Sequence, residues 1–186
     1  MQQEIRKTDE ELIRLAQEGD KLATDALCNR YFWLVRQCAH RFFLLGGEQE
    51  DLIQEGMMGL YFAVLEYKQS GNSSFKHFAS ICISRRIIDA VKKAASKKNA
   101  PLNSYVPVEL QNLGVDFNPE AALIQQDEKR EFNQKMSQVL SNFEFKVMTM
   151  YIDGMTTAEI CEATGKPMKS VDNAVQRSKK KLQKIL

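Results

Sequence analysis

The order of apolar and polar residues along the chain is typical of helices. Apolar residues recur at steps of three or four over three long segments, about residues 22–45, 48–67 and 74–97. This spacing places them on one side of a helix, where they form a stripe that packs against a core. The stripes are Leu27, Tyr31, Leu34, Cys38, Phe42 and Leu45 in the first segment, Ile53, Met57, Leu60 and Val64 in the second, and Ala79, Ile83, Ile87, Ala90, Val91 and Ala94 in the third. The alternation typical of strands is scarce, so the sequence predicts an all-α fold.

Helix start signals favour the same fold class. The capping-box pattern, Ser or Thr followed three residues later by Glu, occurs at 8–11, 141–144 and 156–159. In such a box each of the two side chains accepts a hydrogen bond from an otherwise unpaired backbone amide. Gly46-Gly47 and Gly71-Asn72 end the first two long helices, and three short helices are expected near 142–152, 157–163 and 169–185.

The helical pattern is interrupted after Asn99. Pro101, Pro107, Gly114 and Pro119 fall in a stretch without sustained periodicity, and the pattern resumes from Pro119 to about residue 140. A chain of 186 residues is long enough for one medium domain or two small ones. We therefore expect two small helical domains, 1–99 and 119–186, joined by a linker over 100–118.

Composition excludes several classes of protein. The four cysteines, Cys28, Cys38, Cys82 and Cys161, lie far apart without a C-x-x-C pair, which argues against a zinc site or a disulfide framework. No apolar run approaches the roughly 18 residues that cross a bilayer, and the first residues are too polar for a secretory signal. We expect a cytoplasmic protein with no metal, no cofactor and no membrane partner.

The net charge of +2 hides an uneven distribution. Residues 48–66 carry five acids and no base, and residues 109–131 carry six acids and two bases. In contrast, residues 85–98 carry six bases and one acid, and residues 166–184 carry seven bases and one acid. Two basic segments separated by acidic ones indicate contact with a polyanion at two places, although two solvated lysine-rich faces would give the same pattern.

The C-terminal pattern is typical of a helix-turn-helix motif. A short helix with Ala158, Ile160 and Cys161 inward is followed by a turn at Gly165 and a longer helix. The longer helix turns Val171, Ala174, Val175, Ser178 and Leu182 inward. Its outer face carries residue types that pair with base edges, while Lys179, Lys180, Lys181 and Lys184 suit phosphates. That outer face consists of Lys169, Ser170, Asp172, Asn173, Gln176, Arg177 and Lys180. A plain helical hairpin is the alternative.

Two ordered motifs in the N-terminal half resemble the bacterial sigma-70 superfamily of RNA polymerase sigma factors. They are D-L-I-Q-E-G-M-M-G-L-Y at 51–61 and F-K-H-F-A-S-I-C-I-S-R-R-I-I-D at 75–89. The segments 140–154 and 169–182 resemble region 4 of that family, so 1–99 would be region 2 and 119–186 region 4. The segments 101–105 and 169–177 are most similar to the sigma-H subgroup, which is of the sporulation and stationary-phase type.

The resemblance implies a polymerase-docking face on the helix of the first motif. Asp51, Gln54, Glu55 and Met58 share one face of this helix because they follow three- and four-residue steps. In the family this face docks on the coiled coil of the polymerase clamp, and region 4 contacts the flap. Without the motif, an acidic face would simply be solvated, and no histidine lies nearby to support a metal or acid–base site.

The second motif implies recognition of the promoter −10 element. Phe78 matches the aromatic position that receives a base flipped from the non-template strand, although a core aromatic is the alternative. Arg85, Ile88 and Asp89 match positions that face the upstream edge of the element. Phosphate contacts would come from Lys92, Lys93, Lys97 and Lys98. Where housekeeping members carry two tryptophans, this chain has Ile81-Cys82, which suggests weaker melting.

The function that the resemblance implies is that of an alternative sigma factor, which is not an enzyme. It would bind the polymerase core, direct it to promoter DNA and help to melt the −10 region, while its helix-turn-helix reads the −35 element. An anti-sigma factor is a further partner that the family admits. The rival hypotheses are an autonomous helix-turn-helix regulator, a nuclease that uses the acidic cluster, and a sigma-mimicking protein that binds polymerase without initiating transcription.

Overall fold

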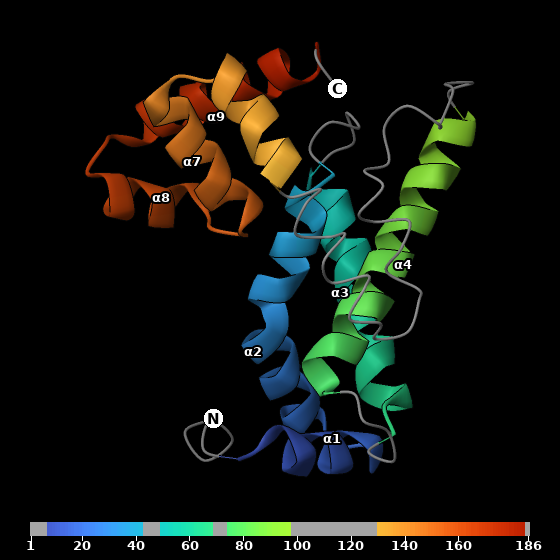
Figure 1. The fold of residues 1–186 in the computed structure, drawn as a ribbon. Helices are drawn as coiled ribbons and strands as arrows, with labels where there is room; N and C mark the ends of the chain where they lie inside the picture. The colour runs from blue at the N-terminus through green and yellow to red at the C-terminus, as the bar shows by residue number, and fades with distance from the viewer. Residues whose placement is uncertain (1–6, 43–48, 69–73, 98–129, 185–186) are drawn as a thin grey trace.

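The computed structural model describes residues 7–42, 49–68, 74–97 and 130–184, with the backbone alone for 94–97. Helices dominate these ranges and no strand occurs in them, so the predicted all-α class is confirmed (Figure 1). The proposed linker over 100–118 and the start of the helix expected from residue 119 lie outside the described residues. None of the helices in the described ranges combines the length and the apolar character needed to cross a bilayer.

The first domain contains α1 (Asp9–Gln17), α2 (Lys21–His40), α3 (Gln49–Glu66) and α4 (Phe75–Lys97). The long helices α2, α3 and α4 pack side by side, and α1 crosses their lower end in Figure 1. The core between them is apolar and fully buried, and it includes Leu12, Leu27, Val35, Phe42, Leu60, Ile83 and Ile87. Helix α2 ends at His40, five residues before its expected end, and Leu45 lies outside the described residues.

The second domain contains a helical stretch over 130–139, followed by α7 (Asn142–Ile152), α8 (Thr157–Thr164) and α9 (Met168–Leu182). All three capping boxes predicted from the sequence are present, at Thr8, Ser141 and Thr156. Helix α8 ends at Gly165, whose φ of 65° is left-handed and favours glycine. The expected inward face of α9 is confirmed. Ala158 of α8 was expected inward but is exposed, since Ile160 alone fills the core from this short helix.

Two glycines of α3 allow close packing, Gly59 against the backbone of α4 and Gly56 against side chains of α2 and α4. A Cβ atom on Gly59 would lie 2.8 Å from the Ile83 Cα and 2.9 Å from the Cys82 carbonyl oxygen, both backbone atoms of α4. A Cβ on Gly56 would lie 2.8 Å from the Val35 Cγ1. The buried face of α3 is therefore centred on these glycines. The stripe predicted from the sequence was partly displaced from this face, since Ile53 and Met57 are only half-buried. The buried residues of α3 are Leu52, Gly56, Gly59, Leu60, Ala63 and Val64.

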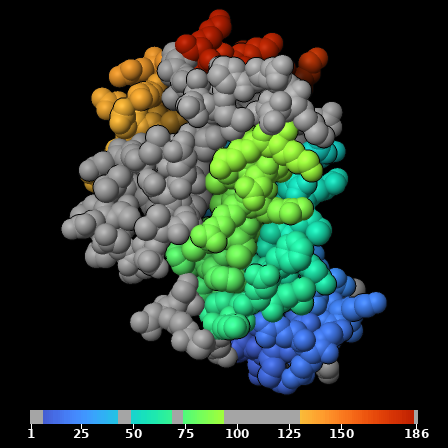
Figure 2. All heavy atoms as spheres, turned by 90° about the vertical axis from the view of Figure 1, so that its right-hand side faces the viewer, coloured from blue at the N-terminus to red at the C-terminus, as the bar shows by residue number. Residues whose placement is uncertain are grey.

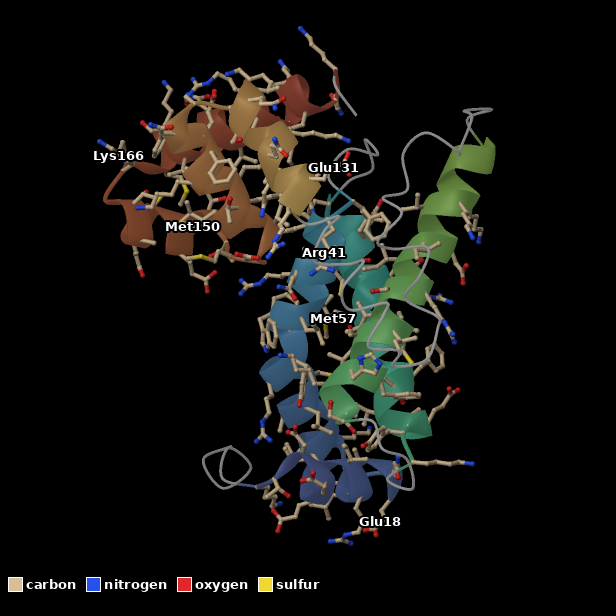
Figure 3. The ribbon with its side chains drawn as sticks, viewed as in Figure 1. Glu18, Arg41, Met57, Glu131, Met150 and Lys166 are labelled. Carbon is tan, nitrogen blue, oxygen red and sulfur yellow. The ribbon has the colours of Figure 1, made fainter. Side chains whose placement is uncertain are left out.

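The second domain contacts the C-terminal half of α2. The Tyr151 ring of α7 stacks on the His40 ring, with centroids 4.0 Å apart and planes 3° from parallel. His40 Nδ1 donates to the Tyr151 carbonyl oxygen at 2.6 Å, and the Tyr151 hydroxyl donates to Gln49 Oε1 at 2.6 Å. The turn after α7 approaches α2 through Gly154, where an added Cβ would lie 2.9 Å from the Gln37 amide nitrogen. Figure 3 marks this end of α2 with Arg41.

The surroundings of His40 favour its neutral form. Burial lowers the pKa of His40, and the cations Lys179 on α9 and Arg36 on α2 lower it further, against the opposing effect of the hydrogen bond to Tyr151. The Lys179 ammonium also lies over the Tyr151 ring, 4.7 Å from its centroid, and donates to the Tyr151 hydroxyl at 3.0 Å. Protonation of His40 would therefore add a positive charge to an interdomain contact that already holds Lys179 and Arg36, which is unfavourable.

We predict that Gly59→Ala destabilises the first domain more than Gly56→Ala does. The new methyl at residue 59 would meet the backbone of α4, which cannot move without shifting the helix, and such overpacking costs about 1–3 kcal/mol. At residue 56 it would meet the ends of the Val35 and Ile87 side chains, which can adjust, and alanine gains about 1 kcal/mol in helix propensity over glycine. Urea unfolding of the two variants measures the difference. If the two variants were equally stable, the backbone of α4 would not limit the space at residue 59.

We also predict that the two domains separate as pH falls. The pKa of His40 is lower when the domains are in contact than when they are apart, so the separated form binds more protons. The contact is therefore most stable above pH 6.5, the ordinary pKa of histidine. It weakens as pH falls from 6.5 toward the lowered pKa. The radius of gyration from small-angle X-ray scattering should increase between about pH 7.5 and pH 5.5. His40→Phe, which keeps a stacking ring without a proton to gain, should lose this dependence. The control is His77→Gln, which removes the other, exposed histidine of the chain. This variant should keep the pH dependence of the radius of gyration.

Candidate nucleic-acid interface

The outward face of α3 carries the predicted docking residues and continues beyond them. Asp51, Gln54 and Met58 are exposed, and Glu55 is half-buried. The same three- and four-residue steps lead on to large apolar side chains that are 41–42% exposed, namely Tyr61, Phe62 and Leu65. These three were missed from the sequence, although the spacing from Met58 would have indicated them. We call the set from Asp51 to Leu65 the α3 stripe: a polar first half followed by an apolar second half.

Glu55 also holds α3 and α4 together at the surface. Its Oε2 accepts a hydrogen bond from Arg86 Nε of α4 at 2.8 Å. Both side chains are more than a third exposed, so this pair contributes at most about 1 kcal/mol to stability. Its effect on the site is to orient the Glu55 carboxylate, which is shared between the α3 stripe and the neighbouring helix.

Phe78 lies at an aromatic cluster near the start of α4. Its ring is half-buried and sits 5.6 Å from the Tyr67 ring, tilted by 53°. Tyr67 in turn contacts Phe75 edge-on at 5.4 Å, and Phe75 is buried in the core. Phe78 is therefore neither a fully buried core residue nor a free surface ring. Tyr67, which sequence reasoning did not single out, completes an aromatic pair with it.

The remaining predicted residues of α4 follow one side of the helix. Arg85, Asp89, Lys92 and Lys93 are exposed, and Ile88 is half-buried against the core. From Phe78 to Lys93 this side extends about 22 Å, at 1.5 Å per residue. Figure 2 shows the α4 surface, in green, beside that of α3. The side chain of Lys97 and the whole of Lys98 lie outside the described residues.

The outer face of α9 is presented as the sequence predicted. Six of its seven residues are exposed and Ser170 is half-buried; the exposed ones are Lys169, Asp172, Asn173, Gln176, Arg177 and Lys180. The buried face, from Val171 to Leu182, packs against α7 and α8. This short helix, tight turn and longer helix form a helix-turn-helix whose second helix has a polar and basic outer face.

A buried carboxylate anchors part of the basic charge of α9. Glu144, the third residue of α7, is 4% exposed and accepts from Lys181 Nζ at 2.7 Å and from Arg177 Nε at 3.2 Å. Burial alone would raise the pKa of Glu144, but donation from Lys181, Ser141 and Arg177 outweighs it and lowers the pKa to about 2. Glu144 therefore stays ionised and fixes two cations of α9, of which Arg177 belongs to the outer face.

Two of the lysines assigned to phosphates from the sequence have internal partners instead. Lys181 pairs with Glu144, and Lys179 donates to the Tyr151 hydroxyl, where burial lowers the pKa of Lys179. Lys180 and Lys184 are exposed. The four-lysine run is therefore divided by the helix period into residues that face the protein and residues that face solvent.

The helix-turn-helix also exposes an apolar side chain that the sequence reasoning missed. Met168, the first residue of α9, is 48% exposed, and its sulfur lies 3.9 Å from the Cys161 sulfur of α8. The adjacent turn, marked by Lys166 in Figure 3, lies at the end of the domain away from α4 in that view. Within the described ranges, no group of three or more histidine, cysteine, aspartate or glutamate residues is placed to hold a metal ion.

Comparison with known proteins identifies the family of the chain. The sigma-70 region 2 model matches residues 27–97, and the sigma-70 region 4 model matches residues 135–182. The chain is 40% identical to the RNA polymerase sigma-H factor of Bacillus licheniformis, covering 96% of this chain and 86% of that protein. It is 38% identical to the RNA polymerase sigma-H factor of Bacillus subtilis, covering 96% and 88%, and 33% identical to the RNA polymerase sigma factor SigA of Lactococcus lactis, covering 59% and 33%. Since both helical domains match in order and nearly the whole chain aligns, this protein belongs to the sigma-70 family of RNA polymerase sigma factors.

Proposed function

We propose that this chain is an alternative sigma factor of the sigma-H type. It binds the RNA polymerase core, brings it to specific promoters and assists melting of the −10 region, without catalysis of its own. The observation that carries the proposal is that the α3 stripe and the side of α4 with half-buried Phe78 and exposed Arg85 both reach the surface, on two helices in close backbone contact at Gly59. A docking surface and a DNA reader are thereby joined rigidly.

The α3 stripe has the composition of a docking surface. Met58, Tyr61 and Phe62 supply large apolar and aromatic groups, and Asp51 and Gln54 supply a polar end. Protein interfaces typically combine an apolar and aromatic centre with a polar rim. We assign this stripe to the coiled coil of the polymerase clamp, as the family resemblance implies, with Glu55 oriented by Arg86.

The aromatic pair on α4 suits capture of an unstacked base. Stacking of a base on an aromatic side chain contributes about 1–3 kcal/mol and tolerates any base, because every base has a π-face. Phe78 and Tyr67 lie close enough to act on one base, and Arg85, Asp89, Lys92 and Lys93 lie farther along the same helix for the upstream part of the −10 element. Lys97 would extend the phosphate contacts.

The second domain is assigned to the −35 element. Residues on the N-terminal turns of a recognition helix reach base edges in the major groove, and Lys169, Asp172, Asn173 and Gln176 occupy those turns of α9. We further propose 1–99, 100–118 and 119–186 as the functional divisions, with the flap of the polymerase as the partner of region 4 and an anti-sigma factor as a regulator.

This function requires the two domains to move apart. The −10 and −35 elements lie about 25 base pairs apart, which is about 85 Å of duplex at roughly 3.4 Å per base pair. In this structure residues of both domains contact α2. Tyr151 of the second domain contacts α2 at His40, and Phe75 of α4 contacts α2 at Tyr31. These two contact points are nine residues apart, or about 13 Å along the helix. A linker of 19 residues can extend to about 60 Å, so it can supply most of this span, and the dimensions of the two domains must supply the rest.

Run-off transcription tests the proposal. Core polymerase of Bacillus subtilis, the source of a relative 38% identical to this chain, should initiate at new specific sites on genomic fragments when the protein is added. We predict that Asp51→Arg with Met58→Ala lowers affinity for the core by at least about tenfold, or about 1.4 kcal/mol, since loss of one interface hot spot costs about 2 kcal/mol or more. Analytical ultracentrifugation measures that affinity.

The matched control for the docking variant is Glu10→Arg with Leu22→Ala. It also reverses one exposed acid and truncates one exposed apolar side chain, but on α1 and α2, outside the α3 stripe. It should bind the core normally. Core binding without any new start site would show a polymerase-binding mimic instead of a sigma factor, and equal binding by both variants would refute the docking face.

The role of Phe78 is separable from docking. We predict that Phe78→Leu, which keeps an apolar side chain against the core, reduces open-complex formation by about 5- to 150-fold, because it removes 1–3 kcal/mol of base stacking. Phe78→Tyr, which keeps the ring, should retain most activity. Permanganate reactivity of −10 thymines measures melting, and core affinity should be unchanged in both variants. A parallel loss of core binding would show that the residue acts only on folding.

A further inference from the structure

Met168 is an exposed apolar residue at the first position of the helix proposed to read DNA, at the edge between its buried and outer faces. Within the described part of the second domain it is the large apolar side chain left exposed, at 48%. The core of this domain is filled from α9 by Val171, Ala174, Val175 and Leu182, all buried, so Met168 does not complete it. Its exposure therefore calls for an explanation outside the core.

The position of Met168 brings it to the DNA. It is the first residue of α9, preceded by Pro167 at φ −65°, and Asp172 lies one helical turn farther along the same side. Recognition helices enter the major groove with their N-terminal residues against the base edges. The Met168 sulfur rests 3.9 Å from the Cys161 sulfur of α8, so this contact locates the end of the flexible side chain at the junction of the two helices.

Thymine alone among the four bases presents a methyl group, on C5, in the major groove, beside its O4 acceptor. The other bases present hydrogen-bond donors and acceptors there. A methionine side chain is polarizable and adapts its shape to such a group. On this ground we propose that Met168 determines part of the −35 specificity by contacting the C5-methyl of a thymine. The inference rests on the proposed function, because it requires α9 to read the −35 element.

Deoxyuridine substitution tests this contact directly. Deoxyuridine keeps the Watson–Crick pairing and the O4 acceptor of thymine and lacks the methyl group. Holoenzyme is titrated against the strongest promoter mapped by run-off transcription, with each thymine of its −35 element replaced in turn. We expect one replacement to weaken binding about fourfold, the effect of exposing one buried methyl group.

Variants of Met168 assign the effect to this side chain. Met168→Gln has similar length but a polar end and should bind the thymine and deoxyuridine promoters equally, whereas Met168→Leu should keep most of the difference. Leu22→Gln, an exposed apolar residue on α2, should behave as the unaltered chain. If no replacement weakens binding, or if Met168→Gln still discriminates fourfold, the inference is wrong. If the unaltered holoenzyme fails to protect the −35 element of unmodified promoter DNA, the proposed function itself is wrong.

Discussion

The close approach of α3 and α4 is the constraint on which the first domain depends. At Gly59 the two helices are separated by too little space for a Cβ atom, because the Ile83 Cα and the Cys82 carbonyl lie within 3 Å of where it would be. This contact sets the distance between the α3 stripe and the aromatic pair of Phe78 and Tyr67. A polymerase-bound α3 would therefore carry α4 to a defined place on the DNA without any flexible joint between docking and reading.

The connection between the two domains has the opposite character. It is made by a few polar and aromatic contacts around Tyr151, including a histidine whose protonation opposes it, and it leaves the outer face of α9 exposed. A small contact of this kind can hold a compact free protein and still yield when DNA and polymerase offer larger surfaces. Each domain is rigid, and the two domains can separate. This combination suits a protein that binds two separated elements of one DNA duplex.

Much of this organisation was predictable from the sequence because it depends on local patterns. The three capping boxes and the inward face of α9 were confirmed, as were the described stripe residues of α2 and α4, with the exception of half-buried Ala90. Leu45 and the side chain of Ala94 lie outside the described residues. The burial of α3 was misplaced, because hydrophobicity alone gives glycines no weight and the face of α3 turns toward α4 through Gly56 and Gly59. Tyr61, Phe62 and Leu65 were missed although their spacing continues the docking face from Met58.

The sequence by itself determined the helices, their order, the family motifs and the residue types available for docking and reading, since helix periodicity and capping act over three or four residues. Tertiary structure decided which charged and aromatic groups are free to act. Lys179 and Lys181 are committed to Tyr151 and Glu144, which lie about 30 residues away in the chain, while Phe78 is paired with Tyr67. Such partners come together only through folding, so no local pattern reveals them.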